Sequence, residues 1–207
     1  MKTEAKGLLL VVSAPSGAGK TTICKKFLKK NDTVKYAIST TTRLPRQGEQ
    51  DGVDYHFTSK ETFLKMVENG AFLEYAKVYN EFYGTSRKTV TELIEHGYDV
   101  LADVDTQGAS SIRKLIPESI HIFILPPSLK VLEQRLRDRG KDRDEVIKLR
   151  LSEAKTEIRQ SYLYDYVIIN DKVDSAVDVL QSILIANRSD TNRNQGVIRT
   201  LLGENNE

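Results

Sequence analysis

The sequence predicts an α/β fold in which helices cover both faces of a parallel sheet. Apolar runs of strand length alternate with amphipathic segments of helix length along most of the chain, and this alternation is typical of parallel sheets. The first apolar run leads into a glycine-rich turn that opens a helix, where such folds usually bind ligands. Polar turns and short strands interrupt the pattern between about residues 45 and 85, so we expect a small β-rich insert that overhangs the carboxyl edge of the sheet.

The composition is that of one globular domain with nearly balanced charge. The chain has 207 residues, of which 31 are basic and 29 acidic, for a formal net charge of +2. This balance gives no reason to expect nucleic-acid or membrane-surface binding. Cys24 is the only cysteine, so no internal disulfide can form and a cytoplasmic location is expected. No apolar run approaches the roughly 20 residues of a membrane span, and the N-terminal residues lack a signal-peptide pattern. Whether the chain forms a homo-oligomer stays open.

A phosphate-binding loop is predicted directly after the first strand. In the Walker A motif, a glycine and four free positions precede Gly-Lys-Ser/Thr; here Gly19, Lys20 and Thr21 form its end and Ala14 replaces the first glycine. Small residues let the main-chain N–H groups of residues 17–22 converge, and the helix dipole adds a positive end that favours polyphosphate. A plain glycine turn is the alternative, but the flanking strand and helix favour the nucleotide site. The ATP-binding residues predicted for this P-loop NTPase-type fold are Ala14, Pro15, Ser16, Gly17, Ala18, Gly19, Lys20, Thr21 and Thr22.

Three side chains at this edge have specific expected roles. Lys20 can reach the outer phosphate oxygens as a mobile positive charge, and the Thr21 hydroxyl can bind the Mg²⁺ ion that accompanies ATP. Asp103 ends an apolar strand, where a second magnesium-binding acid stands in folds of this type. The alternative for Asp103 is an acid that faces solvent at a strand end.

The remaining elements follow from local signals. Thr58 and Glu61 have the spacing of a capping box, and Ser86, Thr106 and Ser128 precede other amphipathic segments. The predicted strands are 8–12, 34–39, 72–78, 82–84 (a hairpin with 72–78 around Asn80), 100–105, 120–125 and 166–170. The predicted helices are 23–30, 59–69 closed by Gly70, 86–96 closed by Gly97, one from 106 that Pro117 ends, one from 128, one through 147–158, and 173–187.

Apolar spacing indicates which helix faces are buried. The core-facing residues expected in the helix from 128 and in the next one are Leu129, Leu132, Leu136, Ile147, Leu151, Ala154 and Ile158. Residues 188–207 are polar apart from a small apolar patch at 197–202, and this tail is expected to be mobile or loosely docked.

The segment TTRLPRQGEQDGVDYHF, residues 41–57, resembles guanylate kinase in the order of its Thr, Arg, acidic, glycine and aromatic residues. The resemblance extends from about Gly7 to Asn187 through FLEYA, YGT, DVDTQG, the arginines of 135–150 and IIND. It implies a guanylate kinase-like domain over 1–187, with a core of 7–42 and 86–187, a GMP-binding insert at about 43–85, a helical lid at about 135–150, and a separate tail over 188–207.

The chemistry of GMP gives independent reasons for several of these residues. Two guanidinium forks and two phenols can bind a dianionic phosphate directionally, and Arg43, Arg46, Tyr55 and Tyr83 can supply that set. A carboxylate such as Glu74 can accept hydrogen bonds from the adjacent N1–H and amino group of guanine, an edge that adenine lacks. Each residue alone could be a solvated charge or a packing side chain; the ordered series favours the GMP site. The resemblance adds Ser39, Thr85 and Asp105 to that site.

The resemblance also implies an activity, transfer of a phosphoryl group from Mg·ATP to GMP and dGMP in guanine nucleotide recycling. Lys20, Arg135, Arg139 and Arg150 would then neutralise charge on the moving group, and Asn170 would lie beside the adenine of ATP. One alternative is a kinase of the same fold that acts on another phosphorylated acceptor, such as a ribosyl bisphosphate. A peptide-binding scaffold domain is disfavoured, because such domains generally have a degenerate loop whereas this chain keeps Gly19, Lys20 and Thr21.

Overall fold

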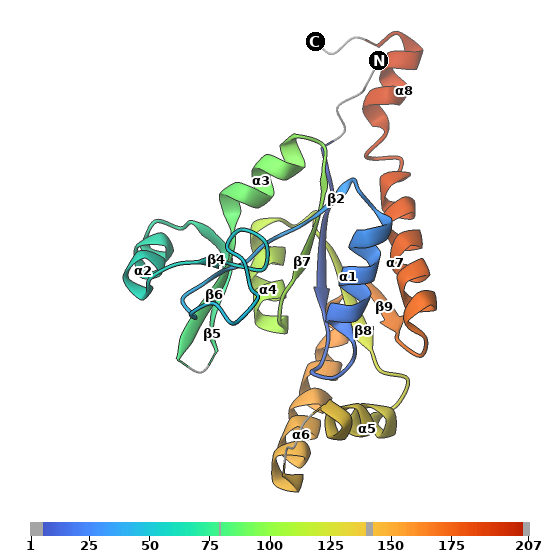
Figure 1. The fold of residues 1–207 in the computed structure, drawn as a ribbon. Helices are drawn as coiled ribbons and strands as arrows, with labels where there is room; N and C mark the ends of the chain where they lie inside the picture. The colour runs from blue at the N-terminus through green and yellow to red at the C-terminus, as the bar shows by residue number, and fades with distance from the viewer. Residues whose placement is uncertain (1–5, 79, 140–142, 205–207) are drawn as a thin grey trace.

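A five-stranded parallel sheet forms the centre of the molecule, as predicted (Figure 1). The computed structural model describes residues 6–78, 80–139 and 143–204. In order across the sheet, the strands are β2 (Val34–Tyr36), β7 (Asp99–Asp103), β1 (Leu9–Ser13), β8 (Ile120–Leu125) and β9 (Tyr166–Ile169). All four pairings are parallel, so the carboxyl ends of the strands meet at one edge, where the loop after β1 lies.

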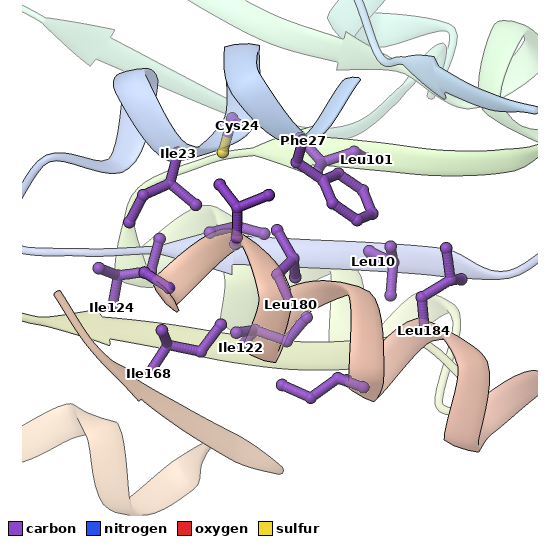
Figure 2. Packing of buried hydrophobic residues seen from close by; sticks show 14 of the residues in the cluster. Leu10, Ile23, Cys24, Phe27, Leu101, Ile122, Ile124, Ile168, Leu180 and Leu184 are labelled. Atoms are coloured by element: carbon purple, nitrogen blue, oxygen red, sulfur yellow. The ribbon is translucent and has the colours of Figure 1, made fainter. Parts of the chain in front are cut away.

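Alternate residues of β1 enter two separate hydrophobic layers. Leu10 and Val12 pack against α1 (Lys20–Lys30) and α7 (Val173–Arg188), in the cluster that Figure 2 shows around Phe27 and Leu180. Leu9 and Val11 face the opposite layer, with α3 (Arg87–Glu95) and α4 (Thr106–Leu115). Each fully buried aliphatic side chain contributes about 1.5–3 kcal/mol. Burial on both faces explains why this strand is continuously apolar rather than alternating.

A second, four-stranded sheet stands beside the first. Its strands, in order, are β4 (His56–Phe57), β3 (Thr40–Thr41), β6 (Glu81–Ser86) and β5 (Phe72–Val78), and α2 (Lys60–Glu68) packs on it. The predicted hairpin is confirmed by the antiparallel β5–β6 pair. The predicted strand 34–39 is too long, because the chain leaves the first sheet after Tyr36 and joins the second one at Thr40.

An aromatic cluster forms the core beneath this second sheet. The Phe63 ring stacks on the rings of Phe72 and Phe82 at centroid distances of 4.5 and 5.5 Å, and the Phe63 side chain is fully buried. A Cβ at Gly84 would lie 2.9 Å from the Phe72 ring, so only glycine fits there. The second sheet thus has its own small core, which fixes β5 and β6 at the edge of the main sheet.

Two predicted helix caps are wrong by one residue. Ser59, not Thr58, caps α2 by accepting a hydrogen bond from the Thr62 N–H, because the Thr58 N–H still pairs with the Thr41 carbonyl beside β3. Asp105, not Thr106, caps α4 through a 2.7 Å bond from the Gly108 N–H. A carboxylate also gains from the positive helix end, which a hydroxyl does not.

The two helices predicted to carry the lid and the C-terminal tail differ in part from their predictions. The helices α5 (Leu129–Arg139) and α6 (Asp144–Gln160) pack through Leu132, Leu136 and Ala154, but Leu129 is 41% exposed, because it starts the helix before the packed turn. A 3₁₀ turn (Ser161–Leu163) leads on to β9. The tail contains a helix that was not predicted, α8 (Gln195–Leu202), anchored by Asn194 on the Arg188 carbonyl.

A buried carboxylate at the amino end of the main sheet was also not predicted. Asp99 is 3% exposed; its Oδ1 accepts from the Leu8 N–H at 2.7 Å and its Oδ2 from the Arg188 guanidinium at 2.6 Å. This pair ties the end of α7 to β1 and β7, on the opposite edge from the phosphate loop.

In the described part of the chain, no helix is long and apolar enough to span a membrane.

The buried His121 on β8 should make the free energy of unfolding depend on pH. Burial and the charge of Arg113 lower its pKa from 6.5 to about 4, while Asp165 acts in the opposite direction; its ring also bonds Ser119 Oγ. The unfolded chain therefore binds more protons between these two values, so stability falls as pH falls from 6.5 to about 4, by about 3 kcal/mol from this group. Urea unfolding at pH 7, 6 and 5 measures the fall, which should be smaller in His121→Gln.

The exposed His96 provides the matched control for this measurement. Carboxylates also contribute to acid sensitivity, so the comparison between variants, rather than the wild-type slope, isolates His121. His96→Gln makes the same substitution at an exposed position, so the difference between the two variants reports on the buried ring. Equal slopes for wild type and His121→Gln would contradict the prediction.

Candidate active site

The loop that is predicted to bind phosphate joins β1 to α1 through two glycines in the left-handed region. Gly17 and Gly19 have φ values of 91° and 97°, which side chains with a Cβ rarely adopt. Close packing adds to this requirement: a Cβ on Gly19 would lie 2.3 Å from the Asn170 Nδ2, and one on Gly17 would lie 3.0 Å from Leu132 and Leu136. The loop is therefore packed against Asn170, which directly follows β9, and against α5, with its N–H groups at the start of α1.

Asn170 holds the loop through its side chain. Its Nδ2 donates to the Ala18 carbonyl at 2.7 Å, and the residue is 2% exposed. Its Oδ1 has no hydrogen-bond partner in the described part of the chain. The same residue lines a hollow of about 330 Å³ on the outer side of the loop, with Gly17, Gly19, Thr22, Arg135, Asp138 and Val173. Asn170 thus borders the space where the sequence predicts adenine, while its amide supports the loop.

Lys20 and Asp103 form an ion pair at the carboxyl edge of the sheet. The Lys20 Nζ contacts the Asp103 carboxylate and donates to the Val104 carbonyl at 3.0 Å. The Asp103 side chain is 15% exposed, so both charges lie in a partly desolvated site. The first residue of α1 and the last residue of β7 therefore meet at this edge, as the parallel sheet requires; their placement beside phosphates stays a prediction.

This pair faces a cleft of about 710 Å³ between the main sheet and the second sheet. The cleft brings together Lys20, Thr21 and Asp103 with Ser39, Tyr55, Glu74, Tyr83 and Asp105, all of which the sequence predicts as site residues. It is also lined by Cys24, Lys25, Leu28, Tyr36, Glu49, Val53, Asp54, Ala76, Val78 and Val104. Burial raises the pKa of the Cys24 thiol to about 12, so this cysteine is neutral.

Arg43 stands at the rim of the cleft among aromatic and acidic groups. Its Nη2 donates to Glu49 Oε1 at 2.8 Å, and its guanidinium carbon lies 5.3 Å from the Tyr55 ring centroid. The hydrogen bonds that the Arg43 guanidinium donates to Glu49 and to the Tyr83 side chain raise the pKa of Arg43. The Arg46 N–H binds the other Glu49 oxygen at 2.8 Å, whereas the Arg46 side chain is exposed. Glu49 therefore organises the turn that carries both arginines.

Glu74 lies on β5, deep in the cleft. The Thr85 hydroxyl donates to Glu74 Oε1 at 2.6 Å. Burial raises the pKa of Glu74, and the Thr85 hydrogen bond acts in the opposite direction. A Cβ on Gly108 would lie 2.9 Å from Glu74 Oε2, so the glycine of α4 makes room for this carboxylate. Asp105 caps the same helix, with Oδ1 bound to the Gly108 N–H. The two carboxylates thus share one wall of the cleft.

The arginines of α5 and α6 contact the outer side of the loop. Arg135 donates to the Asn170 carbonyl at 3.1 Å and to the Ala18 carbonyl at 3.4 Å, and Arg150 donates to Ser16 Oγ at 3.1 Å. The Arg139 side chain and Gly140 lie outside the described residues, so the structure places neither of them. Two of the three predicted lid arginines are therefore at the loop.

Two candidate oxygen ligands for a magnesium ion line the cleft. The Thr21 hydroxyl and the Asp103 carboxylate both line it, and hard oxygen donors suit Mg²⁺. No cluster of three or more His, Cys, Asp or Glu side chains suited to a metal exists within the described residues. The residues present therefore fit an ion that takes its other ligands from nucleotide phosphates and water, as Mg²⁺ does in kinases.

Sequence reasoning did not assign a site role to Glu49 or Gly108. Glu49 belongs to the ordered series in residues 41–57, but its partner cannot be read from the series, because acids and arginines in a turn usually remain solvated. Gly108 ends the DVDTQG segment. A glycine in the first turn of a predicted helix can indicate that another group packs closely against that turn, and this was the available signal.

Comparisons with known proteins agree with this arrangement. A family model described as "Guanylate kinase" matches residues 6–187. A guanylate kinase of Clostridioides difficile (strain 630) is 48% identical over 193 residues, covering 93% of this chain and 94% of that protein. Another, of Pseudomonas fluorescens (strain Pf0-1), is 46% identical over 202 residues and covers 98% of each chain. The crystal structure of guanylate kinase from Anaplasma phagocytophilum is similar, with a TM-score of 0.73, 34% identity and coverage of 91% and 90%.

Proposed function

The chain belongs to the guanylate kinase family and is an ATP:GMP phosphotransferase, and we propose how the described cleft and loop perform this reaction. The observation that carries the assignment of residues is that Lys20, Asp103 and Glu74 line one cleft. ATP binds along the loop with its adenosine toward the outer hollow, and GMP fills the cleft between the two sheets. The γ-phosphoryl group then lies between them, at Lys20.

On the donor side, the loop residues 14–22 bind the phosphates through main-chain N–H groups and the helix dipole. Lys20 leaves Asp103 to bind the outer phosphate oxygens. Thr21 and Asp103 would hold Mg²⁺, which would neutralise charge on the phosphates when bound. Asn170 keeps the loop in shape and borders the adenine.

On the acceptor side, Arg43, Arg46, Tyr55 and Tyr83 bind the GMP phosphate. The stacking of Arg43 beside Tyr55 and its bond to Glu49 hold the guanidinium in place before substrate arrives, which reduces the ordering cost of binding. Glu74 accepts from the guanine N1–H and amino group, oriented by Thr85, while Ser39 and Asp105 support the nucleotide. Nothing in this set requires a 2′-hydroxyl, so dGMP is also accepted.

The transfer itself depends on position and charge. A phosphate oxygen of GMP is already nucleophilic, so the reaction needs no side-chain base. Arg135, Arg139 and Arg150 neutralise the three equatorial oxygens together with Lys20, and the lid at about 135–150 closes over both nucleotides to exclude water, which would otherwise consume ATP. The insert at about 43–85, which carries the GMP site, closes from the other side.

An acceptor panel tests the proposed function directly. ADP formation from Mg·ATP is measured in a coupled assay with GMP, dGMP, AMP, UMP, CMP or no acceptor. GMP and dGMP should support turnover, and the other acceptors should give the rate without acceptor, because only guanine offers two adjacent donors to Glu74. Equal turnover of AMP and GMP would contradict the base assignment.

A further inference from the structure

The strand that leads to Arg43 is too short to fix the position of this arginine by itself. Strand β3 has only two residues, Thr40–Thr41, and its last residue lies opposite Tyr83 of β6. The chain then leaves the second sheet and enters the turn that carries Arg43. Two residues of pairing supply few main-chain hydrogen bonds, yet Arg43 and Tyr83 are both assigned to the same phosphate group. Other contacts between the outgoing chain and β6 therefore decide how these two side chains are placed.

The side chain of Thr42 extends the pairing beyond the end of β3. In a hydrogen-bonded antiparallel pair, the two residues exchange both N–H···O bonds. The Thr42 N–H donates to the Phe82 carbonyl at 3.1 Å, whereas the Phe82 N–H donates to the Thr42 Oγ1 at 2.9 Å. The hydroxyl thus supplies an acceptor to β6 at the point where the chain bends away from it.

The hydrogen of the same hydroxyl is bound by a carboxylate. Thr42 Oγ1 donates to Glu81 Oε2 at 2.6 Å, and a charged acceptor makes the stronger hydrogen bond. Because Glu81 takes the hydrogen, the lone pairs of the hydroxyl oxygen are left to face the Phe82 N–H. Thr42 and Glu81 are both partly buried, so water competes less for these bonds. Glu81 therefore fixes the rotation of the Thr42 hydroxyl.

The hydroxyl of Thr41 connects β6 to the main chain of Arg43. Its Oγ1 donates to the Phe82 carbonyl at 2.9 Å and accepts from the Arg43 N–H at 3.2 Å. Thr41 is fully buried. Both hydroxyls thus bind Phe82, the residue directly before Tyr83, and one of them also binds Arg43.

These contacts complete the support of an arginine whose other end is already held. The Arg43 guanidinium donates to Glu49 and lies 5.3 Å from the Tyr55 ring centroid, and the Tyr55 ring meets the Tyr83 ring edge-on at 5.9 Å. A binding group has to lie within about 0.5 Å of its productive position. Glu49 and Tyr55 fix the guanidinium, whereas the two hydroxyls fix the main chain from which it extends.

We propose that Thr41 and Thr42 are positioning residues, whose hydroxyls hold the Arg43 main chain against β6 and so set the place of Arg43 relative to Tyr83. Both act on GMP through Arg43. The inference rests on the proposed function, since that function assigns the GMP phosphate to Arg43. It predicts that loss of either hydroxyl weakens the use of GMP and leaves the use of ATP unchanged.

The test compares Thr41→Val and Thr42→Val with the serine variants at both positions. In each valine variant the KM for GMP should rise roughly ten-fold, the size expected when a polar group loses its partner, and the KM for ATP should stay constant. Serine keeps the hydroxyl, so both serine variants should have a KM for GMP close to the wild-type value. A purely structural role would lower the amount of folded enzyme, which reduces the apparent kcat and leaves both KM values unchanged. Thr91→Val, at an exposed position of α3, is the matched control and should behave as wild type.

A double substitution shows whether the effect passes through Arg43. In an Arg43→Ala background, Thr42→Val should lose most of its effect on kcat/KM for GMP, because the group through which the hydroxyl acts is absent. The inference is overturned by an unchanged KM for GMP in either valine variant, by an equal rise in the KM for ATP, or by the same factor with and without Arg43.

A third position keeps the inference testable if the valine variants fail to fold. Glu81→Ala removes the acceptor that fixes the Thr42 hydroxyl, so the KM for GMP should rise while the KM for ATP stays constant. An unchanged KM for GMP in Glu81→Ala with a wild-type melting temperature would also overturn the inference. Wild-type enzyme without GMP-dependent turnover would refute the proposed function instead.

Discussion

Replacing Lys20 by Met is expected to lower kcat by about a hundred- to a thousand-fold, the size found for removal of one preorganised charge-stabilising donor. The Lys20 Nζ is already at the reacting edge of the sheet, bound to Asp103 and to the Val104 carbonyl. Methionine has similar length and shape but no charge, so the loop should keep its fold while the outer phosphate oxygens lose their cation. The measurement is GMP-dependent ADP formation at saturating Mg·ATP and GMP.

The matched control for this substitution is Lys29→Met on the same helix. Lys29 is exposed near the end of α1, so its replacement makes the same change of charge away from the loop and should leave kcat unchanged. Melting temperatures of both variants separate a catalytic loss from unfolding. If Lys20→Met retained more than about a tenth of wild-type kcat, the assignment of Lys20 to the moving phosphoryl group would be wrong, because one tenth corresponds to only about 1.4 kcal/mol.

The fold could be predicted mainly where local signals were strong. The apolar strand and the Gly19–Lys20–Thr21 end of the motif predict the loop because both signals lie within a few residues of each other. The prediction therefore needs no knowledge of contacts between residues far apart in the sequence. The β5–β6 hairpin is another local feature. By contrast, the Asp99–Arg188 pair joins residues 89 positions apart, and neither residue type indicates burial by itself.

In the candidate site, the identities of several residues could be predicted from the sequence, whereas their contacts with one another could not. Glu74 was predicted from the chemistry of guanine, Tyr83 from that of the GMP phosphate, and both from a resemblance; both line one cleft in the structure. The hydrogen bond from Arg43 to Glu49 and the approach of Gly108 to Glu74 needed the fold, because they depend on how a turn closes and how a helix meets a strand. Helix α8 was missed although Val197, Ile198, Leu201 and Leu202 have helical spacing.

The carboxylate of Glu74 is suited to its assigned role by its surroundings. One oxygen accepts from the Thr85 hydroxyl at 2.6 Å, which fixes the rotation of the carboxylate relative to the cleft. Burial strengthens its hydrogen bonds but raises its pKa. The ionised form is the one that can accept from two guanine donors, so the KM for GMP should rise on the acid side, beginning at a higher pH than for a glutamate of ordinary pKa.

Glu74→Gln is expected to lower kcat/KM for GMP by about a hundred-fold or more while the KM for ATP stays constant. The amide has nearly the same shape, but its NH₂ group would face one of the two guanine donors and leave it unpaired in the cleft, a mismatch that strongly reduces the use of a substrate. The acid-side rise in the KM for GMP should also disappear, since glutamine does not titrate. The melting temperature, measured beside the kinetics, should stay at the wild-type value. Unchanged GMP kinetics in this variant would remove Glu74 from base recognition, and a similar rise in the KM for ATP would show that the substitution disturbs the cleft as a whole.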